Sequence, residues 1–332
     1  MPKTVAMSTE EEIVRAARIL REGGVVAFPT ETVYGLGAHA FDESAVARVF
    51  ELKRRPRFDP LIVHLADPED LPRVAEALPA AARALARRFW PGPLTLVLRK
   101  KAEVPDLVTS GLPTVAVRIP DHPVALRFIR EAGVPVAAPS ANPFGRTSPT
   151  KADHVRRYFP EGVDCILEGG DCSVGVESTV LAFDECGTPR WLRPGGLSLE
   201  EIESLVGPVR IGRKERSGAL SSPGLLDRHY APRTPMKLDP PPEEHPRQGR
   251  WGWIGPGAPD SPGNYAVIES LGDPRDLRQA AARLFAALHR MDEAGLDGIE
   301  ARSVPDSGIG RAVNDRLRKA AASGVVLKAE RT

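Results

Sequence analysis

The chain of 332 residues is poor in cysteine, aromatic residues and net charge. Its three cysteines form no C-x-x-C pair, which argues against a disulfide framework or a zinc knuckle and favours a reducing compartment. Lys plus Arg is 45 and Asp plus Glu is 44, which excludes a histone-like, tail-driven nucleic-acid binder. No apolar run approaches the roughly 18 residues that cross a membrane, and the first residues lack a signal-peptide core. We therefore predict a cytoplasmic protein without membrane contact.

Several widespread catalytic motifs are missing as well. The chain has no G-x-x-x-x-G-K-[ST], no G-x-G-x-x-G, no H-E-x-x-H and no G-x-S-x-G, and its seven His show no metal-ligand spacing. These absences disfavour a P-loop enzyme, a transition-metal enzyme and a serine hydrolase.

What is present is an alternation of helical and strand patterns over the first two hundred residues, which predicts an α/β domain with a mixed sheet. Ser8 and Glu11 form a candidate capping box for the first helix. The expected strands lie at 25–28, 61–65, 94–98, 114–119, 136–138, 165–167 and 178–183.

The composition changes near residue 207, where Pro, Gly and charged residues become frequent and periodicity is lost. The last 80 or so residues again show strand and helix patterns of a small βαβα-type domain. We therefore predict a catalytic domain over 1–207, a linker or lid over 208–247 and a small α/β domain over 248–332.

Five polar clusters are candidates for a ligand site. They are PTETVYGLG (29–37), KRRPRFDPLIVHL (53–65), TVAVRIP (114–120), PSANPFGRTSPT (139–150), and VESTV (176–180) with LRPGG (192–196). Each is weak alone, because turns, helix caps and core positions favour the same residue types.

The cationic residues of these clusters indicate an anionic ligand. Lys53, Arg54, Arg55 and Arg57 repel one another, and a polyanion such as a triphosphate would relieve that repulsion. The alternative is that they only complement the dipole at a helix end. Arg118 lies in an otherwise apolar strand, where an unpaired Arg is rare, so it pairs with either a structural or a substrate carboxylate.

In this order and spacing, the clusters resemble the YrdC-like family of threonylcarbamoyl-AMP synthases. SPGLLDRHYAP (222–232) and GIGRAVNDRLRKAA (308–321) resemble the long, two-domain form of that family. The resemblance implies a twisted mixed sheet with a concave basic face and a Rossmann-like second domain. It implies the conversion of L-threonine, bicarbonate or CO2, and ATP to L-threonylcarbamoyl-AMP, pyrophosphate and water. That reaction begins the threonylcarbamoyladenosine modification of tRNA next to the anticodon.

The resemblance also assigns site residues. The threonine-binding positions correspond to Thr32, His64, Arg118 and Ser178. The ATP-binding positions correspond to Lys53, Arg55, Asp59, Thr114, Ser140, Asn142, Thr150 and Arg193, and His229 and Tyr230 close over the nucleotide. Lys53, Arg55 and Arg193 are expected to stabilise charge on the phosphates, with no covalent protein nucleophile and with Mg²⁺ carried by ATP. Asp59 stands where Asn is expected, and an acid beside phosphates requires a cation.

The family's reaction implies a tRNA-modifying threonylcarbamoyl transferase as downstream partner and leaves direct RNA contact open. One alternative is a double-stranded RNA-binding module that uses the basic hollow without ATP turnover. Another is a carbamoyltransferase relative that uses carbamoyl phosphate, although the zinc-finger C-x-x-C pairs typical of such proteins are missing.

Overall fold

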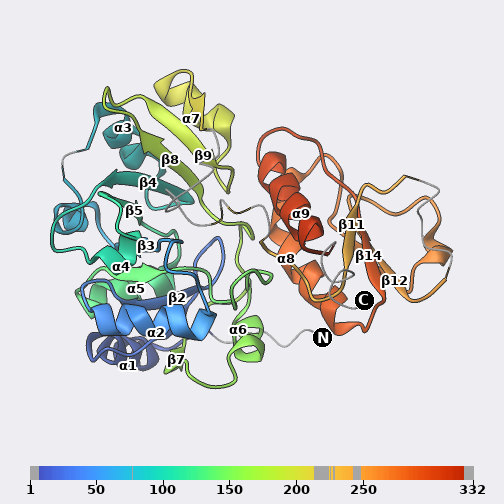
Figure 1. Ribbon diagram of the computed structural model, residues 1–332, viewed down its shortest axis with the longest axis horizontal. Coiled ribbons are helices and arrows are strands. Elements are labelled where there is room, and N and C mark those ends of the chain that lie inside the picture. The colour runs from blue at the N-terminus through green and yellow to red at the C-terminus, as the bar shows by residue number, and fades with distance from the viewer. Residues whose placement is uncertain are drawn as a thin grey trace.

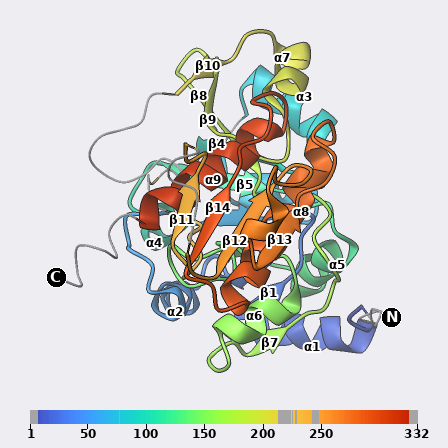
Figure 2. The same cartoon turned by 90° about the vertical axis from the view of Figure 1, so that its right-hand side faces the viewer.

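The computed structural model shows two units, each built on its own sheet and lying side by side (Figure 1). The view turned by 90° places the smaller sheet and its helices in front of the larger unit (Figure 2). The structure describes residues 7–76, 78–212, 224, 226, 229–241 and 248–324.

The first unit is formed around a mixed sheet. Among the described residues this sheet has ten strands, in the order β10-β9-β8-β4-β5-β3-β6-β2-β1-β7. Their bounds are β1 Val26–Phe28, β2 Gly35–His39, β3 Ile62–His64, β4 Leu94–Arg99, β5 Thr114–Arg118, β6 Val136–Ala138, β7 Cys165–Ile166, β8 Thr179–Phe183, β9 Pro189–Arg193 and β10 Arg210–Ile211. The sheet contains parallel pairs such as β3–β5 and antiparallel pairs such as β4–β5, which confirms the predicted mixed sheet.

Helices cover both faces of this sheet. Their bounds are α1 Glu10–Arg21, α2 Glu43–Lys53, η1 Pro68–Arg73, α3 Ala80–Phe89, α4 Asp106–Thr109, α5 Pro123–Ala132, α6 Ala152–Tyr158 and α7 Leu199–Val206. Side chains alternate along a strand, so Ala27 joins the core beneath α2 and α3, whereas Val26 and Phe28 join a second core with α1 and α5.

The second unit contains a parallel sheet. Its strands are ordered β11-β14-β12-β13 and span β11 Met236–Leu238, β12 Trp251–Gly255, β13 Val267–Ser270 and β14 Gly298–Ala301. The turn η3 (Pro262–Asn264) precedes β13, and the helices α8 (Leu277–Glu293) and α9 (Gly310–Gly324) lie between this sheet and the first unit (Figure 1). The prediction of a small α/β unit is confirmed.

Three local predictions need correction. The capping box of α1 is Thr9 with Glu12, one residue later than predicted, and Ser8 instead accepts a hydrogen bond from the backbone of Glu168. No strand was predicted between residues 28 and 61, where the structure has β2. β11 lies inside the stretch interpreted as linker, where its three residues are too few to show a pattern.

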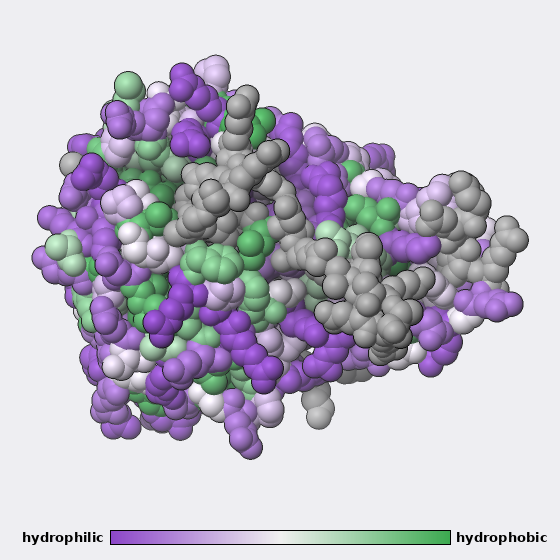
Figure 3. Space-filling view, viewed as in Figure 1, coloured by the Kyte–Doolittle hydropathy of each residue, from purple (hydrophilic) through white to green (hydrophobic). Residues whose placement is uncertain are grey.

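The surface is mainly hydrophilic, with apolar residues in small areas on the face shown in Figure 3. In the part of the chain that the structure describes, no helix has the length and apolar character needed to span a bilayer.

Candidate active site

The register of the central strands places the predicted site residues on one face of the sheet. His64 on β3 lies directly opposite Arg118 on β5, and Ile62 lies opposite Ala116. Because side chains alternate, these four residues point to the same side, away from the core beneath α2. Ile62, His64 and Arg118 line a pocket with about 530 Å³ of space outside the protein atoms, the open solvent at its mouth included.

Arg118 lies at one end of this pocket and is almost fully buried. Its Nη1 donates to Thr32 Oγ1 at 2.8 Å, and its Nε donates to the carbonyl oxygen of Gly92 at 3.2 Å. Its Nη2 lies 2.6 Å from Glu31 Oε1, an ion pair without hydrogen-bond geometry. Of the two predicted partners, the structural carboxylate is therefore present, and Thr30 Oγ1 supports the same loop through Thr32 Oγ1 at 2.8 Å.

His64 beside Arg118 is held as a neutral ring. Burial, with a smaller effect of the Arg118 charge, lowers the pKa of His64 to about 3. Its Nδ1 lies 3.1 Å from the carbonyl oxygen of Ile62, and its ring stands edge-on to Phe28 at 5.6 Å between centroids. A neutral imidazole here contributes shape and one hydrogen-bonding nitrogen to the pocket but no charge.

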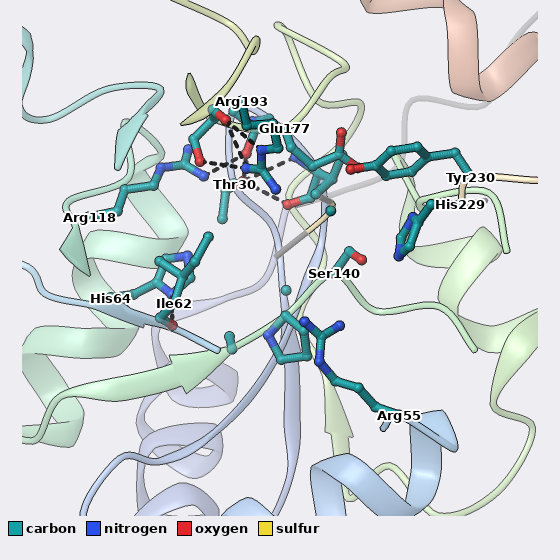
Figure 4. A pocket seen from close by; sticks show the side chains of 17 residues that line it. Thr30, Arg55, Ile62, His64, Arg118, Ser140, Glu177, Arg193, His229 and Tyr230 are labelled. Carbon is teal, nitrogen blue, oxygen red and sulfur yellow. Dashed lines mark hydrogen bonds between the residues drawn. The ribbon is translucent and has the colours of Figure 1, made fainter. Parts of the chain in front are cut away.

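Arg55 projects from the residues after α2 and reaches the pocket from below in Figure 4. Its Nε and Nη2 donate to the carbonyl oxygens of Asp59 and Pro60, each at 2.8 Å, and Nη2 lies 2.9 Å from Asp59 Oδ1. Burial raises the pKa of Asp59, and the charge of Arg55 partly offsets that effect. The cation that an acid at this position requires is therefore Arg55.

Lys53 lies behind the pocket wall. Its Nζ donates to the carbonyl oxygen of Ser140 at 2.6 Å and also to that of Asn142. Burial and the charge of Arg55 lower the pKa of Lys53 well below its usual value. Lys53 thus fixes the loop after β6 that carries Ser140 into the pocket.

Ser178 and Arg193 also line the pocket. Arg193 Nη2 donates to the carbonyl oxygen of Ser178 at 2.8 Å and lies 3.2 Å from Ser178 Oγ, which also pairs with Thr95 Oγ1 at 2.7 Å. A Cβ on Gly195 would lie 2.2 Å from the carbonyl carbon of Ser178. The glycine of the RPGG turn therefore allows β9 to approach this loop closely.

His229 and Tyr230 complete the end opposite Arg118, with Ser140 between the two ends (Figure 4). Their ring centroids lie 4.1 Å apart, and His229 stands edge-on to Phe144 at 5.8 Å. Ala231 donates through its backbone to Gly145 at 2.8 Å, which attaches this segment to the loop after β6. Burial, followed by the charge of Arg55, lowers the pKa of His229, so this ring is also neutral.

Nine of the fourteen predicted site residues line the pocket, all of them within the described residues. They are Thr32, Arg55, His64, Arg118, Ser140, Ser178, Arg193, His229 and Tyr230. Five lie outside its lining: Lys53, Asp59, Thr114, Asn142 and Thr150. Lys53 and Asp59 support pocket residues, whereas Thr114 pairs with Arg99 at the other end of β5 from Arg118.

Sequence reasoning missed three polar residues of the site. Thr30 and Glu177 line the pocket, and Glu31 pairs with Arg118. All three lie inside the PTET and VEST motifs, and this position could have identified them as candidate site residues. The sequence could not show which distant residues they contact.

Two family models match adjoining regions that together make up most of the chain. Residues 18–195 match the Sua5/YciO/YrdC family, described as “Telomere recombination”, and residues 197–322 match “Threonylcarbamoyl-AMP synthase, C-terminal domain”. The chain belongs to the threonylcarbamoyl-AMP synthase family. The two matched regions meet near residue 196, and the predicted limits at 207 and 247 stay a prediction.

Members of this family match along almost the full chain. A threonylcarbamoyl-AMP synthase of Pyrococcus abyssi is 45% identical over 96% of this chain and 96% of its own length. A solved structure described as “Crystal structure of P. abyssi Sua5 complexed with L-threonine” is 44% identical, with a TM-score of 0.87 over 96% of each chain. A synthase of Cellvibrio japonicus is 38% identical over 46% of this chain, which is 82% of its own length, so it has no room for the second unit.

These matches confirm the predicted family, fold and enzyme class. The chain is a transferase of the threonylcarbamoyl-AMP synthase type, and the comparisons favour this function over the RNA-binding module.

Proposed function

We propose that the pocket binds L-threonine at the Arg118 end and ATP toward Arg55, Arg193 and Tyr230, and joins them through CO2. The observation that carries the proposal is the separation of cations within one pocket: Arg118 at one end, Arg55 and Arg193 elsewhere on its walls. One amino-acid carboxylate and one polyphosphate require this division of charge. The P. abyssi structure, which is a complex with L-threonine, supports L-threonine as one of the two ligands.

In the proposed complex, Thr32, His64 and Ser178 surround the amino acid. The Arg118 fork exchanges part of its contact with Thr32 or Glu31 for the substrate carboxylate. The uncharged ring of His64 leaves Arg118 as the cation at this end, so the carboxylate is directed to one position.

Ser140 and Arg193 would contact the nucleotide, with His229 and Tyr230 covering it. Asn142 Oδ1 and Thr150 Oγ1, in the segment that follows Ser140, are buried without a hydrogen-bond partner among the described residues. Buried polar atoms normally have a partner, which a nucleotide or an ordered water would supply. This supports the two residues as nucleotide contacts after a small movement of the loop.

The reaction follows from this arrangement without a protein nucleophile. The amine nitrogen of threonine bonds to CO2 and loses a proton, giving a carbamate. A carbamate oxygen then attacks the α-phosphorus of ATP, and the bond from that phosphorus to the pyrophosphate oxygen breaks. Holding three small reactants together lowers the barrier by roughly 7–11 kcal/mol. Arg55 and Arg193 stabilise the charge that develops on the phosphates.

Mg²⁺ is expected to accompany ATP. The acids nearest the pocket, Glu31 and Glu177, are already paired with Arg118 and Arg316. The described residues include no group of three or more His, Cys, Asp or Glu suited to holding a metal. The ion would therefore be held by phosphates and water and supply charge neutralisation there. The downstream transferase, tRNA contact and a cytoplasmic location stay predictions.

The test is incubation of the chain with ATP, Mg²⁺, bicarbonate and L-threonine, with mass detection of threonylcarbamoyl-AMP and assay of pyrophosphate. L-Serine is the matched control, because one methyl group in an apolar pocket is worth about 1–3 kcal/mol. Threonine-dependent adenylate is expected. Salt-sensitive binding of double-stranded RNA without ATP consumption would contradict the proposal and favour the alternative.

A further inference from the structure

Helix α9 of the second unit contacts the segments that line the pocket of the first through a fully buried arginine. The Arg316 side chain is 0% exposed. Its Nε donates to Glu177 Oε2 at 2.7 Å, and its Nη1 donates to the carbonyl oxygen of Pro194 at 3.0 Å. Glu177 precedes Ser178, and Pro194 follows Arg193, so both acceptors belong to segments that carry pocket residues.

The same arginine contacts the segment that covers the opposite end of the pocket. Arg316 Cζ lies 4.9 Å from the ring centroid of Tyr230, and Lys319 Nζ lies 5.9 Å from it. Lys319 also donates to the carbonyl oxygen of Gly224 at 2.7 Å and to Asp315 Oδ2 at 2.9 Å. Two cations of one helix face therefore hold one aromatic ring through its π face.

Tyr230 needs such support because its backbone is strained. Its φ of 65° lies in the left-handed region, which a side chain of this size rarely adopts. Strained residues persist where their surroundings determine the conformation. Those surroundings include Arg316 and Phe285 of α8, whose ring centroid lies 5.7 Å from that of Tyr230.

The contact with Arg316 also stabilises the buried carboxylate of Glu177. Its Oε1 accepts from Ser148 Oγ at 2.6 Å while Oε2 accepts from Arg316. Burial opposes ionisation, but the charges of Arg316 and Arg193 hold the pKa of Glu177 below its usual value. Without Arg316, a buried carboxylate would face the site proposed for phosphates.

An apolar contact accompanies these polar ones. Val33 of the PTETVYG loop and Val176 belong to the same buried cluster as residues of α8 and α9, including Leu284. The short C. japonicus synthase has no room for these helices. The contacts of Arg316 therefore belong to the long form.

Resting on the proposed function, we propose that Arg316 is a positioning residue through which the second unit holds Tyr230 at the nucleotide end of the pocket, while its pairing with Glu177 anchors it to the pocket lining. It acts on ATP affinity through Tyr230 and leaves the Arg118 end unchanged. The alternative is a purely structural buried ion pair, whose loss lowers stability without selective effect on ATP.

The test is titration calorimetry of the full chain with ATP and, separately, with L-threonine, together with thermal unfolding. Arg316→Met is expected to weaken ATP binding by about tenfold, the ratio expected for one lost hydrogen bond between charged groups. Threonine affinity should change less than about threefold, since Arg118 keeps its contacts. Arg316→Lys should recover part of the ATP affinity, because an ammonium can pair with Glu177 but lacks the fork that also reaches Pro194.

Two further variants separate positioning from folding. Arg318→Met changes an exposed arginine of the same helix and should match the wild type in both affinities. Arg316 Nη1 also donates to Asp315 Oδ2 at 2.7 Å, and Asp315 keeps its ion pair with Lys319 at 2.9 Å when Arg316 is replaced. Glu177→Gln combined with Arg316→Met therefore removes the buried charge that is left without a partner, and it should unfold near the wild-type temperature. Its ATP affinity should remain about tenfold below that of Glu177→Gln alone. Equal ATP affinity in those two variants would overturn the proposal. A wild type that binds ATP but forms no adenylate would instead overturn the proposed function.

Discussion

Replacing Arg118 by methionine tests the amino-acid end of the pocket most directly. The substitution removes the hydrogen bond to Thr32, the contact with Gly92 and the ion pair with Glu31, which lies 2.6 Å away. It also removes the proposed two-pronged contact with the substrate carboxylate. Stability and binding therefore both change, and each needs its own estimate.

The substitution lowers the free energy of unfolding because Glu31, which is 4% exposed, loses its ion pair with Arg118. Breaking a buried ion pair on one side costs about 3–5 kcal/mol. Adding Glu31→Gln removes the unpaired charge, so the double variant should recover to within about 2 kcal/mol of the wild type. The binding effect is at least about 3 kcal/mol for two charged hydrogen bonds, roughly a hundredfold in the Kd for L-threonine.

The assay is calorimetry with L-threonine and with ATP, combined with urea unfolding. The matched control is Arg99→Met, because Arg99 pairs with Glu76 at 3.2 Å on the surface and should contribute less than about 1 kcal/mol. The double variant should fold, bind ATP nearly as the wild type does and fail to bind threonine. Wild-type threonine affinity in that variant, or a selective loss of ATP affinity, would refute the assignment of Arg118.

Three other changes probe the rest of the site. Gly224→Ala would place a Cβ 2.4 Å from the Tyr230 hydroxyl at a φ of 76°, so we expect a loss of about 1–2 kcal/mol in urea unfolding and weaker ATP binding. Gly263→Ala, with open space around it, is the control, and equal effects would contradict this explanation. His64→Gln should reduce acid sensitivity. The folded pKa of His64 is about 3 against 6.5 unfolded, so its stabilising contribution is complete above pH 6.5 and is lost as pH falls toward 3. Between pH 7 and 5 the wild type should lose about 2 kcal/mol more than the variant, and parallel curves would exclude this role. Lys53→Met should cost about 2–3 kcal/mol, because two buried carbonyl oxygens lose their donor; unchanged urea unfolding would show that they find another.

Local patterns predicted much of the fold. The apolar runs at 61–65 and 114–119 became β3 and β5, because a buried strand needs little beyond a short apolar segment. β2 was not predicted, because its sequence lacks such a local pattern. Gly35–His39 has no alternating pattern, and it is a strand only because β1 and β6 pair with it on either side.

Part of the candidate site could likewise be predicted from the sequence, and part could not. The residue types of the motifs, above all Arg118 within an apolar strand, indicated an anion-binding pocket before any fold was known. The roles of Lys53 and Asp59 could be seen only in the folded chain. Both lie outside the pocket lining, where Lys53 contacts the lining residue Ser140 and Asp59 contacts the lining residue Arg55.

The sequence alone determined most of the elements, their order and the chemical groups available for binding, because periodicity and residue type are local properties. The tertiary structure decided which charges meet. Arg118 pairs with Glu31 across 87 positions, and Arg316 pairs with Glu177 across 139. A cation's effect depends on the few ångströms to its partner and on the exclusion of water, and neither distance nor burial is specified by position along the chain.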